Sequence, residues 1–323
     1  MSLCWSDTMG KNILEYNSMR KKVSEKKLFE KEVEEKLGRN DDCWCKSGKK
    51  YKKCHCAFDE KLEEYRLKGI LVPPRRIIKN PEQIQGIRES AKINIAILDY
   101  IDTHIQAGIS TQEIDDWVSS ITKKHNAIAA PLNYEGFPKS VCTSVNNVVC
   151  HGIPSKEEIL KEGDIINVDV STIYNSYFSD SSRMYCIGEV SAEKKRLVDI
   201  TKQSLEVGLQ YVLPWRKIGD MGAAIHEFAM ENGYSVVREI GGHGVGLEFH
   251  EDPWVSYVCP KDTGMLLVPG MIFTIEPMIN MGKEDIYISD EDGWTVYTDD
   301  GLPSAQWEIQ VLVTDEGYEI ISY

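Results

Sequence analysis

The spacing of apolar and polar residues predicts a chain of amphipathic helices and short buried strands. Residues 81–98 place apolar side chains three to four positions apart behind Pro81, which predicts an amphipathic helix. Similar spacing predicts further helices at about 111–125, with Ser110 or Thr111 as the cap, and at about 191–211 and 218–231. Short apolar runs predict strands at about 140–149, 164–173 and 182–188, and over most of the chain after residue 231.

The first eighty residues show a different pattern. Residues 18–37 are rich in Lys and Glu and have few apolar positions, which predicts a solvated helix that ends at Gly38. Residues 57–80 begin with a short charged helix and continue with prolines that favour an extended path. We interpret them as a linker and place a domain boundary before residue 81.

Four carboxylates interrupt apolar, strand-like runs, where a charge is costly unless it is paired or bound to a cation. They are Asp169, Asp180, Glu276 and Glu308. Asp180 lies eleven positions after Asp169, which suits two adjacent antiparallel strands joined by a turn near Asn175. The runs around Glu276 and Glu308 predict buried strands that each contain one acid.

Two histidines, His243 and His250, lie in the glycine-rich segment 241–253. Glycine leaves room for a ligand to approach closely, and neutral imidazole is a common metal ligand. One such histidine is more often an ordinary core residue. Together with the four predicted buried acids, however, the histidine favours a site for two bridged divalent cations over a lone structural zinc, because oxygen ligands predominate.

His151 and a set of apolar residues complete the candidate site. His151 follows a predicted strand and precedes Gly152, so a loop at this point can direct it into a cleft. The apolar residues that could wall a small pocket are Tyr134, Phe137, Cys142, Phe249 and Trp294. Aromatic residues scattered along a chain also form ordinary cores, so the pocket is a hypothesis.

Four of the nine cysteines crowd into residues 38–56, as Cys-X-Cys, eight residues, then Cys-His-Cys. In a reducing compartment such a cluster favours a metal site over a disulfide framework. Three thiolates and one imidazole close a tetrahedral zinc site, and a site with no open position is structural. The stretch resembles the SEC-C zinc motif, known from the bacterial secretion ATPase, where it docks a chaperone and the ribosome. The resemblance implies Cys43, Cys45, Cys54 and His55 as ligands, with Cys56 as an alternative to His55.

Length, composition and charge narrow the class of protein. A chain of 323 residues with 42% hydrophobic residues suits one large domain and a small appendage. The net charge of −14 divides unevenly, because residues 1–68 carry 17 Lys and Arg against 13 Asp and Glu, a net of +4, and the remainder carries −18. The appendage is therefore the part suited to contact RNA, although a solvated charged helix would show the same balance.

The sequence contains no pattern that directs it to a membrane. The first ten residues have neither a basic lead nor an apolar core, and no run reaches the roughly 18 apolar residues of a membrane span. We therefore expect a cytoplasmic protein that does not contact membranes, and we expect it to be a monomer.

From about residue 75 to residue 323 the chain resembles the methionine aminopeptidases of the bacterial, or type I, class. Seven ordered segments carry the resemblance: residues 143–146 with 150–154, 167–170, 180–184, 241–246, 250–253, 274–278 and 305–308. The resemblance implies the α+β "pita-bread" fold and removal of the first methionine from nascent chains whose second residue is small. It also implies two divalent cations, of Co, Mn, Fe or Zn, in addition to the structural zinc.

The resemblance assigns roles to the candidate residues. It implies that Asp169, Asp180, His243, Glu276 and Glu308 hold the two metals, with Asp180 and Glu308 bridging them. It implies that His151 and His250 contact the substrate, and that Glu276 moves a proton. The sequence departs from the family pattern at Asn147, Ser179 and Ile309, where Glu, Gly and His are usual. None of these three is an implied ligand, so we expect the departures to tune activity.

Two alternatives remain open at this point. One is an Xaa-Pro peptidase on the same fold, whose members usually carry a full extra N-terminal domain. The other is an inert pita-bread protein that binds ribosomes or RNA, and such proteins have lost the ligand set. The expected organisation is a charged helical extension (1–37), a zinc motif (38–56), a linker (57–80) and a peptidase domain (81–323). We expect the zinc motif to dock the enzyme at the ribosome, or else to be a stability appendage.

Overall fold

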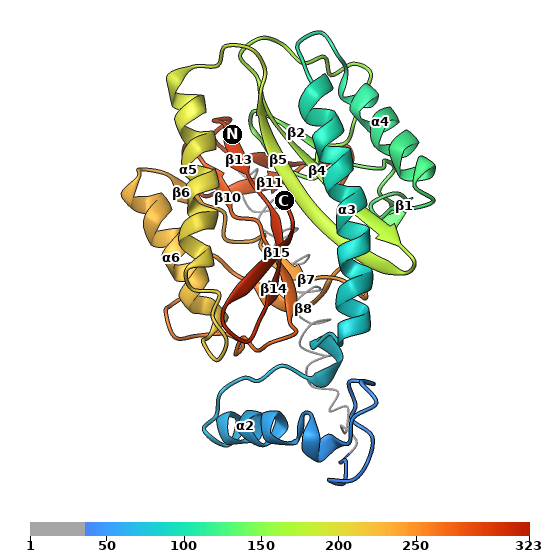
Figure 1. The fold of residues 1–323 in the computed structure, drawn as a ribbon. Coiled ribbons are helices and arrows are strands. Elements are labelled where there is room, and N and C mark those ends of the chain that lie inside the picture. Colours follow the sequence, from blue (N-terminus) through green and yellow to red (C-terminus); the bar gives the residue numbers. More distant parts are fainter. Residues whose placement is uncertain (1–35) are drawn as a thin grey trace.

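The computed structural model describes residues 36–323, so the helix predicted over residues 18–37 lies almost wholly outside the described residues. Figure 1 shows a large domain of helices around sheets, with a small N-terminal module below it. We define the N-terminal module as residues 36–70. Its elements are η1 (Tyr51–Lys53) and α2 (Cys56–Leu67).

The N-terminal module packs on the large domain through α2. The ring of Phe58 lies 5.6 Å from that of Trp215 and the ring of Tyr65 stacks on it at 5.8 Å, centroid to centroid. Lys61 Nζ lies 3.6 Å from the centroid of the Trp215 ring, and Leu62 is buried in the main core of the domain. The module is therefore part of the packed structure.

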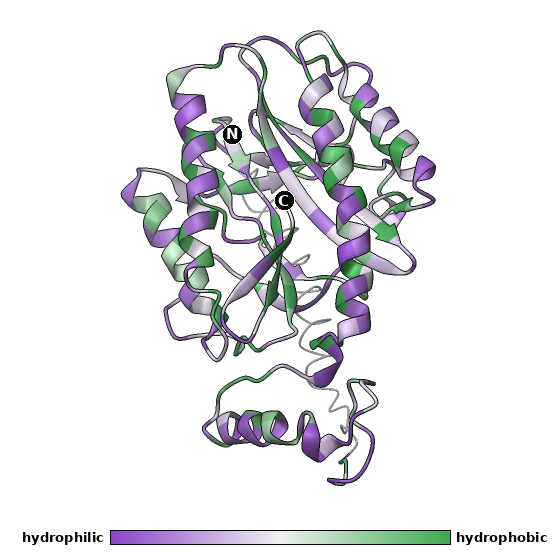
Figure 2. Cartoon of the chain, viewed as in Figure 1, coloured by the Kyte–Doolittle hydropathy of each residue, from purple (hydrophilic) through white to green (hydrophobic). Residues whose placement is uncertain are grey.

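Four long helices confirm the predicted amphipathic segments. They are α3 (Pro81–His104), α4 (Thr111–Lys124), α5 (Ala192–Leu209) and α6 (Ile218–Glu231). Helix α3 continues beyond the predicted end at residue 98 because Ile101 lies on the same buried face as Ile97. Figure 2 shows hydrophobic and hydrophilic residues alternating along α3 and α5.

Side-chain caps define where two of these helices begin. The Asn80 side chain accepts a hydrogen bond from the Gln83 backbone, and the Gln83 side chain accepts one from the Asn80 backbone. The same reciprocal pair joins Ser110 and Glu113, so Ser110 is the cap of α4. Each capping box satisfies backbone N–H groups that the first helical turn leaves unpaired.

A long hairpin forms the centre of the first sheet. Strands β4 (Ile165–Tyr174) and β5 (Tyr177–Cys186) pair along their whole length, and the turn residues Asn175 and Ser176 both have positive φ. A two-residue turn of this kind matches the twist of the strands and confirms the turn expected near Asn175. Strand β5 therefore begins before the predicted strand at 182–188. Strands β1 (Ile128–Ala129) and β2 (Cys142–Val145) also pair with β4, and α3 packs against the hairpin.

Three further sheets complete the large domain. A five-stranded sheet has the order β15 (Tyr318–Ser322), β14 (Ile309–Val313), β9 (Ile272–Ile275), β7 (Gly242–Gly244) and β8 (Glu251–Val255). One three-stranded sheet has the order β13 (Ser304–Gln306), β10 (Met278–Asn280) and β6 (Ser235–Val236). The other has the order β11 (Ile286–Ile288), β12 (Val296–Thr298) and β3 (Val148–Cys150). Helices α5 and α6 pack on each other and beside β13, β10 and β6.

Two acids that were predicted inside strands lie between strands. Glu276 follows the end of β9 and precedes β10, and Glu308 follows β13 and precedes β14. The predicted strand at 140–149 is likewise divided into β2 and β3 by a turn at Asn146. The Glu308 backbone pairs with Ser182 of β5 in both directions, which joins the first sheet to the five-stranded one. The breaks thus place both carboxylates where the sheets meet.

The proline-containing segment 71–80 packs into the large domain. It is extended apart from the single turn η2 (Arg75–Ile77). The Leu71 carbonyl accepts from the Leu266 backbone, the Lys79 backbone donates to Gly270, and Ile77 is 1% exposed. Residues 71–80 are therefore bound to the domain that they precede. Within the part of the chain that the structure describes, no helix has the length and apolar character of a membrane span.

Candidate metal centres

One cavity of the large domain collects the residues that the sequence singles out there. The side chains that line it include the expected acids and histidines and the expected pocket wall: Asp169, Asp180, His243, Glu276, Glu308, His151, His250, Tyr134, Phe137, Cys142, Phe249 and Trp294. They come from both strands of the hairpin, from β2, β7 and the two strand breaks, and from the segments before β2, after β3, before β8 and before β12. The fold thus brings these residues together from across more than half of the chain.

The acids lie deep in this cavity. Asp180, Glu276 and Glu308 are 3%, 7% and 2% exposed. Asp180 Oδ1 accepts a hydrogen bond of 2.7 Å from Ser171 Oγ, which sits opposite Asp180 in the β4–β5 pairing. Asp169 Oδ1 is buried and has no hydrogen-bond partner among residues 36–323. A buried carboxylate oxygen without a partner fits a cation ligand.

His243 faces the acids with one ring nitrogen. Its Nδ1 lies 3.0 Å from the Gly244 carbonyl, which can only accept, so Nδ1 carries the proton. The other ring nitrogen, Nε2, lies 3.7 Å from Asp180 Oδ2 and 3.6 Å from Glu276 Oε1. Ligand atoms of Asp180, His243 and Glu308 lie within 4.8 Å of one another. This spacing is suited to a shared divalent cation.

Burial makes these carboxylates difficult to ionise together. Loss of solvent raises the pKa of Asp169 to about 7. Loss of solvent, and then the charges of neighbouring acids, raise the pKa of Asp180 and of Glu308 well above the ordinary range. A divalent cation would remove this penalty, so the donor set fits the metals that the sequence implies.

Glu276 is held by two neighbours that the sequence analysis missed. Thr274 Oγ1 donates to Glu276 Oε1 at 2.7 Å, and Gln306 Nε2 donates to Oε2 at 3.1 Å. Thr274 and Glu276 are two positions apart, and so are Gln306 and Glu308. Residues two apart in an extended segment share a face, so this spacing could have indicated that Thr274 and Gln306 lie on the same side as the acids.

The remaining two histidines lie on the cavity wall. His151 has a φ of 57°, an uncommon conformation for a residue other than glycine, and it directs its side chain to the cavity. His250 Nδ1 lies 2.9 Å from Tyr134 Oη, and the ring of Tyr134 contacts that of Phe249 at 4.9 Å. The histidines and the apolar wall are thus neighbours.

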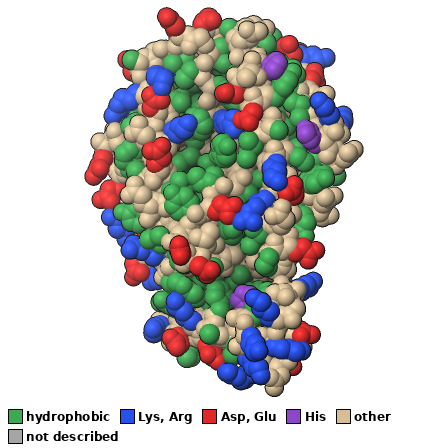
Figure 3. All heavy atoms as spheres, in the orientation of Figure 1, with side chains coloured by type: hydrophobic (Ala, Val, Ile, Leu, Met, Phe, Trp, Pro, Cys, Tyr) green, Lys and Arg blue, Asp and Glu red, His purple; other side chains and the backbone are tan. Residues whose placement is uncertain are grey.

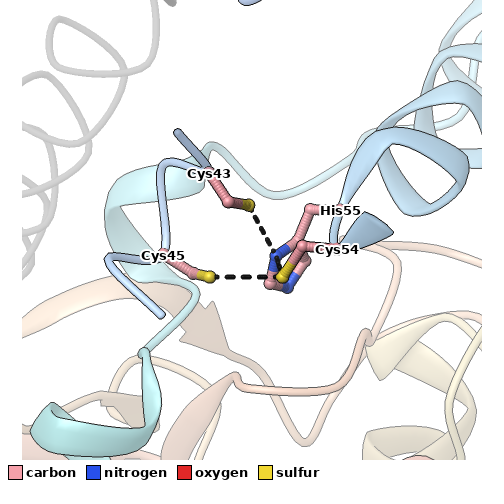
Figure 4. A group of neighbouring side chains, drawn as sticks. All are labelled: Cys43, Cys45, Cys54 and His55. Atoms are coloured by element: carbon pink, nitrogen blue, oxygen red, sulfur yellow. Dashed lines mark hydrogen bonds between the residues drawn. The ribbon is translucent and has the colours of Figure 1, made fainter. Parts of the chain in front are cut away.

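A second cluster lies in the N-terminal module (Figure 4). Ligand atoms of Cys43, Cys45, Cys54 and His55 lie within 4.8 Å of one another. His55 Nδ1 lies 3.2 Å from the sulfur atoms of Cys43 and Cys54, and burial lowers the pKa of His55, which favours the neutral form that binds metal. The sulfur of Cys56 points elsewhere and donates to Glu60 Oε1 at 3.3 Å.

Comparison with protein families finds a match that spans each of the two clusters. Residues 85–315 match the metallopeptidase family M24, and residues 39–55 match the SEC-C motif. The chain belongs to metallopeptidase family M24. Within family M24 it is 43% identical over 290 residues to a methionine aminopeptidase of Chlamydia pneumoniae, which covers 88% of this chain and 99% of that protein.

Solved structures of family M24 share the fold. The methionine aminopeptidase of Rickettsia prowazekii superposes with a TM-score of 0.75 at 43% identity, over 76% of this chain and 99% of that one. A prolidase of Pyrococcus furiosus superposes with a TM-score of 0.62 at 24% identity, over 77% of this chain and 66% of that one. The likeness to the prolidase shows the fold alone, so the pita-bread α+β class is confirmed and the Xaa-Pro alternative is not favoured.

We expect the metal-free protein to lose stability as the pH rises from about 4 to about 7. A carboxyl with a raised pKa holds its proton more tightly in the folded state than in the unfolded state. Its contribution to the free energy of unfolding is therefore complete below its pKa in the unfolded state. That contribution is lost as the pH rises past its pKa in the folded state, about 7 for Asp169. Calorimetry with excess EDTA should show this decline, and Asp169→Asn should make it shallower without removing it, because the pKa values of Asp180 and Glu308 are also raised. An equally steep decline in Asp169→Asn would contradict the assignment, and added Mn²⁺ should restore stability at the higher pH.

Proposed function

We propose that the protein removes the N-terminal methionine from polypeptides by hydrolysing their first peptide bond. The observation that carries the proposal is one cavity lined by the five candidate metal ligands, two further histidines and an apolar wall. The 43% identity to a methionine aminopeptidase supports this substrate over an Xaa-Pro peptide. An inert binding protein would have no need of the complete ligand set.

Five residues would hold two divalent cations: Asp169, Asp180, His243, Glu276 and Glu308. Mn, Fe, Co and Zn all accept such a set of oxygen and imidazole ligands. When bound, the cations lower the pKa of water towards neutrality and so supply a nucleophile.

Glu276 moves the proton in this proposal. Thr274 and Gln306 each hold one of its carboxylate oxygens, so its orientation is fixed before substrate arrives. A general acid–base group must lie within hydrogen-bond reach of the reacting atoms, and Glu276 lines the cavity beside the other acids. It can take a proton from the attacking water and give it to the leaving amine.

His151 and His250 bind the scissile amide. Nδ1 of His250 lies 2.9 Å from Tyr134 Oη, and both His250 and His151 line the cavity beside the acids. A hydrogen bond to a developing oxyanion contributes about 3 kcal/mol. Asp169 would bind the free amine of the substrate, which fixes the cut after the first residue.

An apolar wall accepts the methionine side chain. Its members are Tyr134, Phe137, Cys142, Phe249 and Trp294, and Phe137 is 3% exposed with its ring 5.3 Å from that of Trp294. A flexible thioether side chain fills such an irregular apolar space well. The resemblance to the methionine aminopeptidases supports substrates whose second residue is small.

With added Mn²⁺ or Co²⁺, we expect release of methionine from Met-Ala-Ser and little release from a peptide with a bulky second residue. Glu276→Gln should lower kcat by at least about 100-fold, because an amide cannot carry the proton. Mass spectrometry of the peptides measures both results, and metal content should be measured in parallel. Wild-type turnover in Glu276→Gln would overturn its role, and cleavage of Xaa-Pro peptides alone would overturn the proposed substrate.

We propose further that the cysteine cluster of the N-terminal module holds one structural zinc, bound by Cys43, Cys45, Cys54 and His55. The module buries few large side chains of its own, and a closed tetrahedral site supplies the missing stability. The orientation of Cys56 towards Glu60 supports His55 as the fourth ligand.

Zinc content tests this ligand set in the full chain. We expect Cys43→Ser and His55→Ala each to lower the zinc bound per chain by one, measured by plasma mass spectrometry against the unaltered protein. Cys56→Ser is the matched control and should retain the zinc, because its sulfur lies outside the cluster. Loss of zinc in Cys56→Ser with retention in His55→Ala would move the fourth ligand to Cys56.

We propose that the N-terminal module docks the enzyme at the ribosome, where its substrates emerge in the cytoplasm. Exposed lysines surround the cysteine cluster, and Figure 3 shows Lys and Arg side chains gathered at this end of the molecule. They are Lys46, Lys49, Lys50, Lys52 and Lys53. The large domain is acidic, so the basic module is the part that RNA would attract.

Charge reversal tests the docking role without exposing the core. We expect Lys46→Glu/Lys49→Glu/Lys53→Glu to weaken salt-sensitive co-sedimentation with ribosomes and to leave tripeptide cleavage within about twofold, because no lysine lies in the cavity. The control, Lys123→Glu/Lys124→Glu/Lys156→Glu, makes the same charge change at exposed positions of the large domain. Equal co-sedimentation of both variants would contradict docking. Deletion of residues 1–70 should weaken co-sedimentation as the charge reversal does.

A further inference from the structure

A buried lysine lies beside the loop that carries His250. The side chain of Lys79 is 0% exposed, and its Nζ donates to Glu251 Oε2 at 2.7 Å and to the Ile77 carbonyl at 3.3 Å. Burial lowers the pKa of Lys79, and the charge of Glu251 opposes that change. A buried ion pair is seldom more stabilising than apolar residues of similar volume, so stability alone does not explain the Lys79–Glu251 pair.

The second oxygen of Glu251 shapes the loop itself. Glu251 Oε1 accepts a hydrogen bond of 3.0 Å from the Leu247 backbone. This bond closes a five-residue turn, and within the turn lie Phe249 and His250, which both line the cavity. The Glu251 carboxylate therefore binds Lys79 through one oxygen and the loop backbone through the other.

A second ion pair holds the next residue of the loop. Arg76 Nη2 donates to Asp252 Oδ2, and the two side chains are 34% and 12% exposed. Arg76 and Lys79 both belong to segment 71–80, which is itself bound to the large domain. The two residues after His250 are thus each fixed by a cation from this one segment.

We propose that Lys79 and Arg76 are positioning residues that hold His250 in place through Glu251 and Asp252. The inference rests on the proposed function, in which His250 binds the reacting amide. An error of about 1 Å in placing such a group can cost about 100-fold in rate. Segment 71–80 therefore belongs to the catalytic domain, and it serves the active site from outside the cavity.

Kinetics of three variants test the proposal. We expect Lys79→Met to lower kcat about tenfold and Arg76→Gln about threefold, with KM and metal content unchanged, because the lost interaction acts in the transition state. Arg76→Lys should recover most of the loss. The matched control is Arg238→Gln, which breaks the exposed ion pair of Arg238 with Glu284 and should leave kcat unchanged. An unchanged kcat in both Lys79→Met and Arg76→Gln would overturn the proposal.

A double-mutant cycle separates positioning from general stability. In a His250→Ala background, Lys79→Met should lower kcat no further, because its effect passes through the missing imidazole. If Lys79→Met lowers kcat by the same factor in the His250→Ala background as in the unaltered protein, Lys79 has only a structural role and the proposal is overturned. If Lys79→Met fails to fold, Arg76→Gln and Asp252→Asn carry the same cycle, since their ion pair is partly exposed.

A readout without turnover keeps this inference distinct from the proposed function. In ¹⁵N-histidine spectra, the His250 signals, identified by their absence in His250→Ala, should shift in Arg76→Gln and stay in place in Arg238→Gln. Unshifted His250 signals in Arg76→Gln would overturn the inference even with an active enzyme. Shifted signals in a protein that releases no methionine would support the positioning and contradict only the proposed reaction.

Discussion

The burial of several carboxylates in one cavity is the constraint on which the rest of this structure depends. Asp180 and Glu308 are almost fully buried, burial raises the pKa of both, and the charge of Asp180 raises the pKa of Glu308 further. Two features of the fold keep them together: the fully paired β4–β5 hairpin, and the backbone bridge from Ser182 to Glu308 that joins two sheets. The apolar core around these sheets must offset the free energy of that repulsion until cations bind.

The sequence predicts the local parts of this arrangement well. An acid within an apolar run marks a buried carboxylate, and the eleven-residue spacing of Asp169 and Asp180 with a turn at Asn175 gives the hairpin. The same reasoning placed Glu276 and Glu308 inside strands, and the structure places them at breaks. Periodicity cannot separate these cases, because the residues on both sides of a break stay apolar and buried.

Contacts between segments that are distant in the sequence cannot be predicted from local sequence patterns. Lys79 and Glu251 are 172 positions apart, and nothing near either residue indicates which of the many acids and bases will pair. The packing of Phe58 on Trp215 likewise joins residues that are far apart in the sequence. Residues 71–80 show the consequence: prolines and basic residues predict a linker, but Val72 and Ile77 are buried in the core of the large domain. Tertiary packing, and not local composition, decides where that domain begins.

The attachment of the N-terminal module bears on its proposed docking role. Asp59 Oδ2 of α2 accepts hydrogen bonds from Tyr51, Trp44 and Arg75, so one carboxylate ties the cysteine cluster to segment 71–80. With Trp215 packed between Phe58 and Tyr65, the module has a fixed orientation on the large domain. A flexible tether would raise only the local concentration of enzyme near the ribosome. A fixed module would also set the direction in which the cavity faces, and orientation is what a short emerging chain requires.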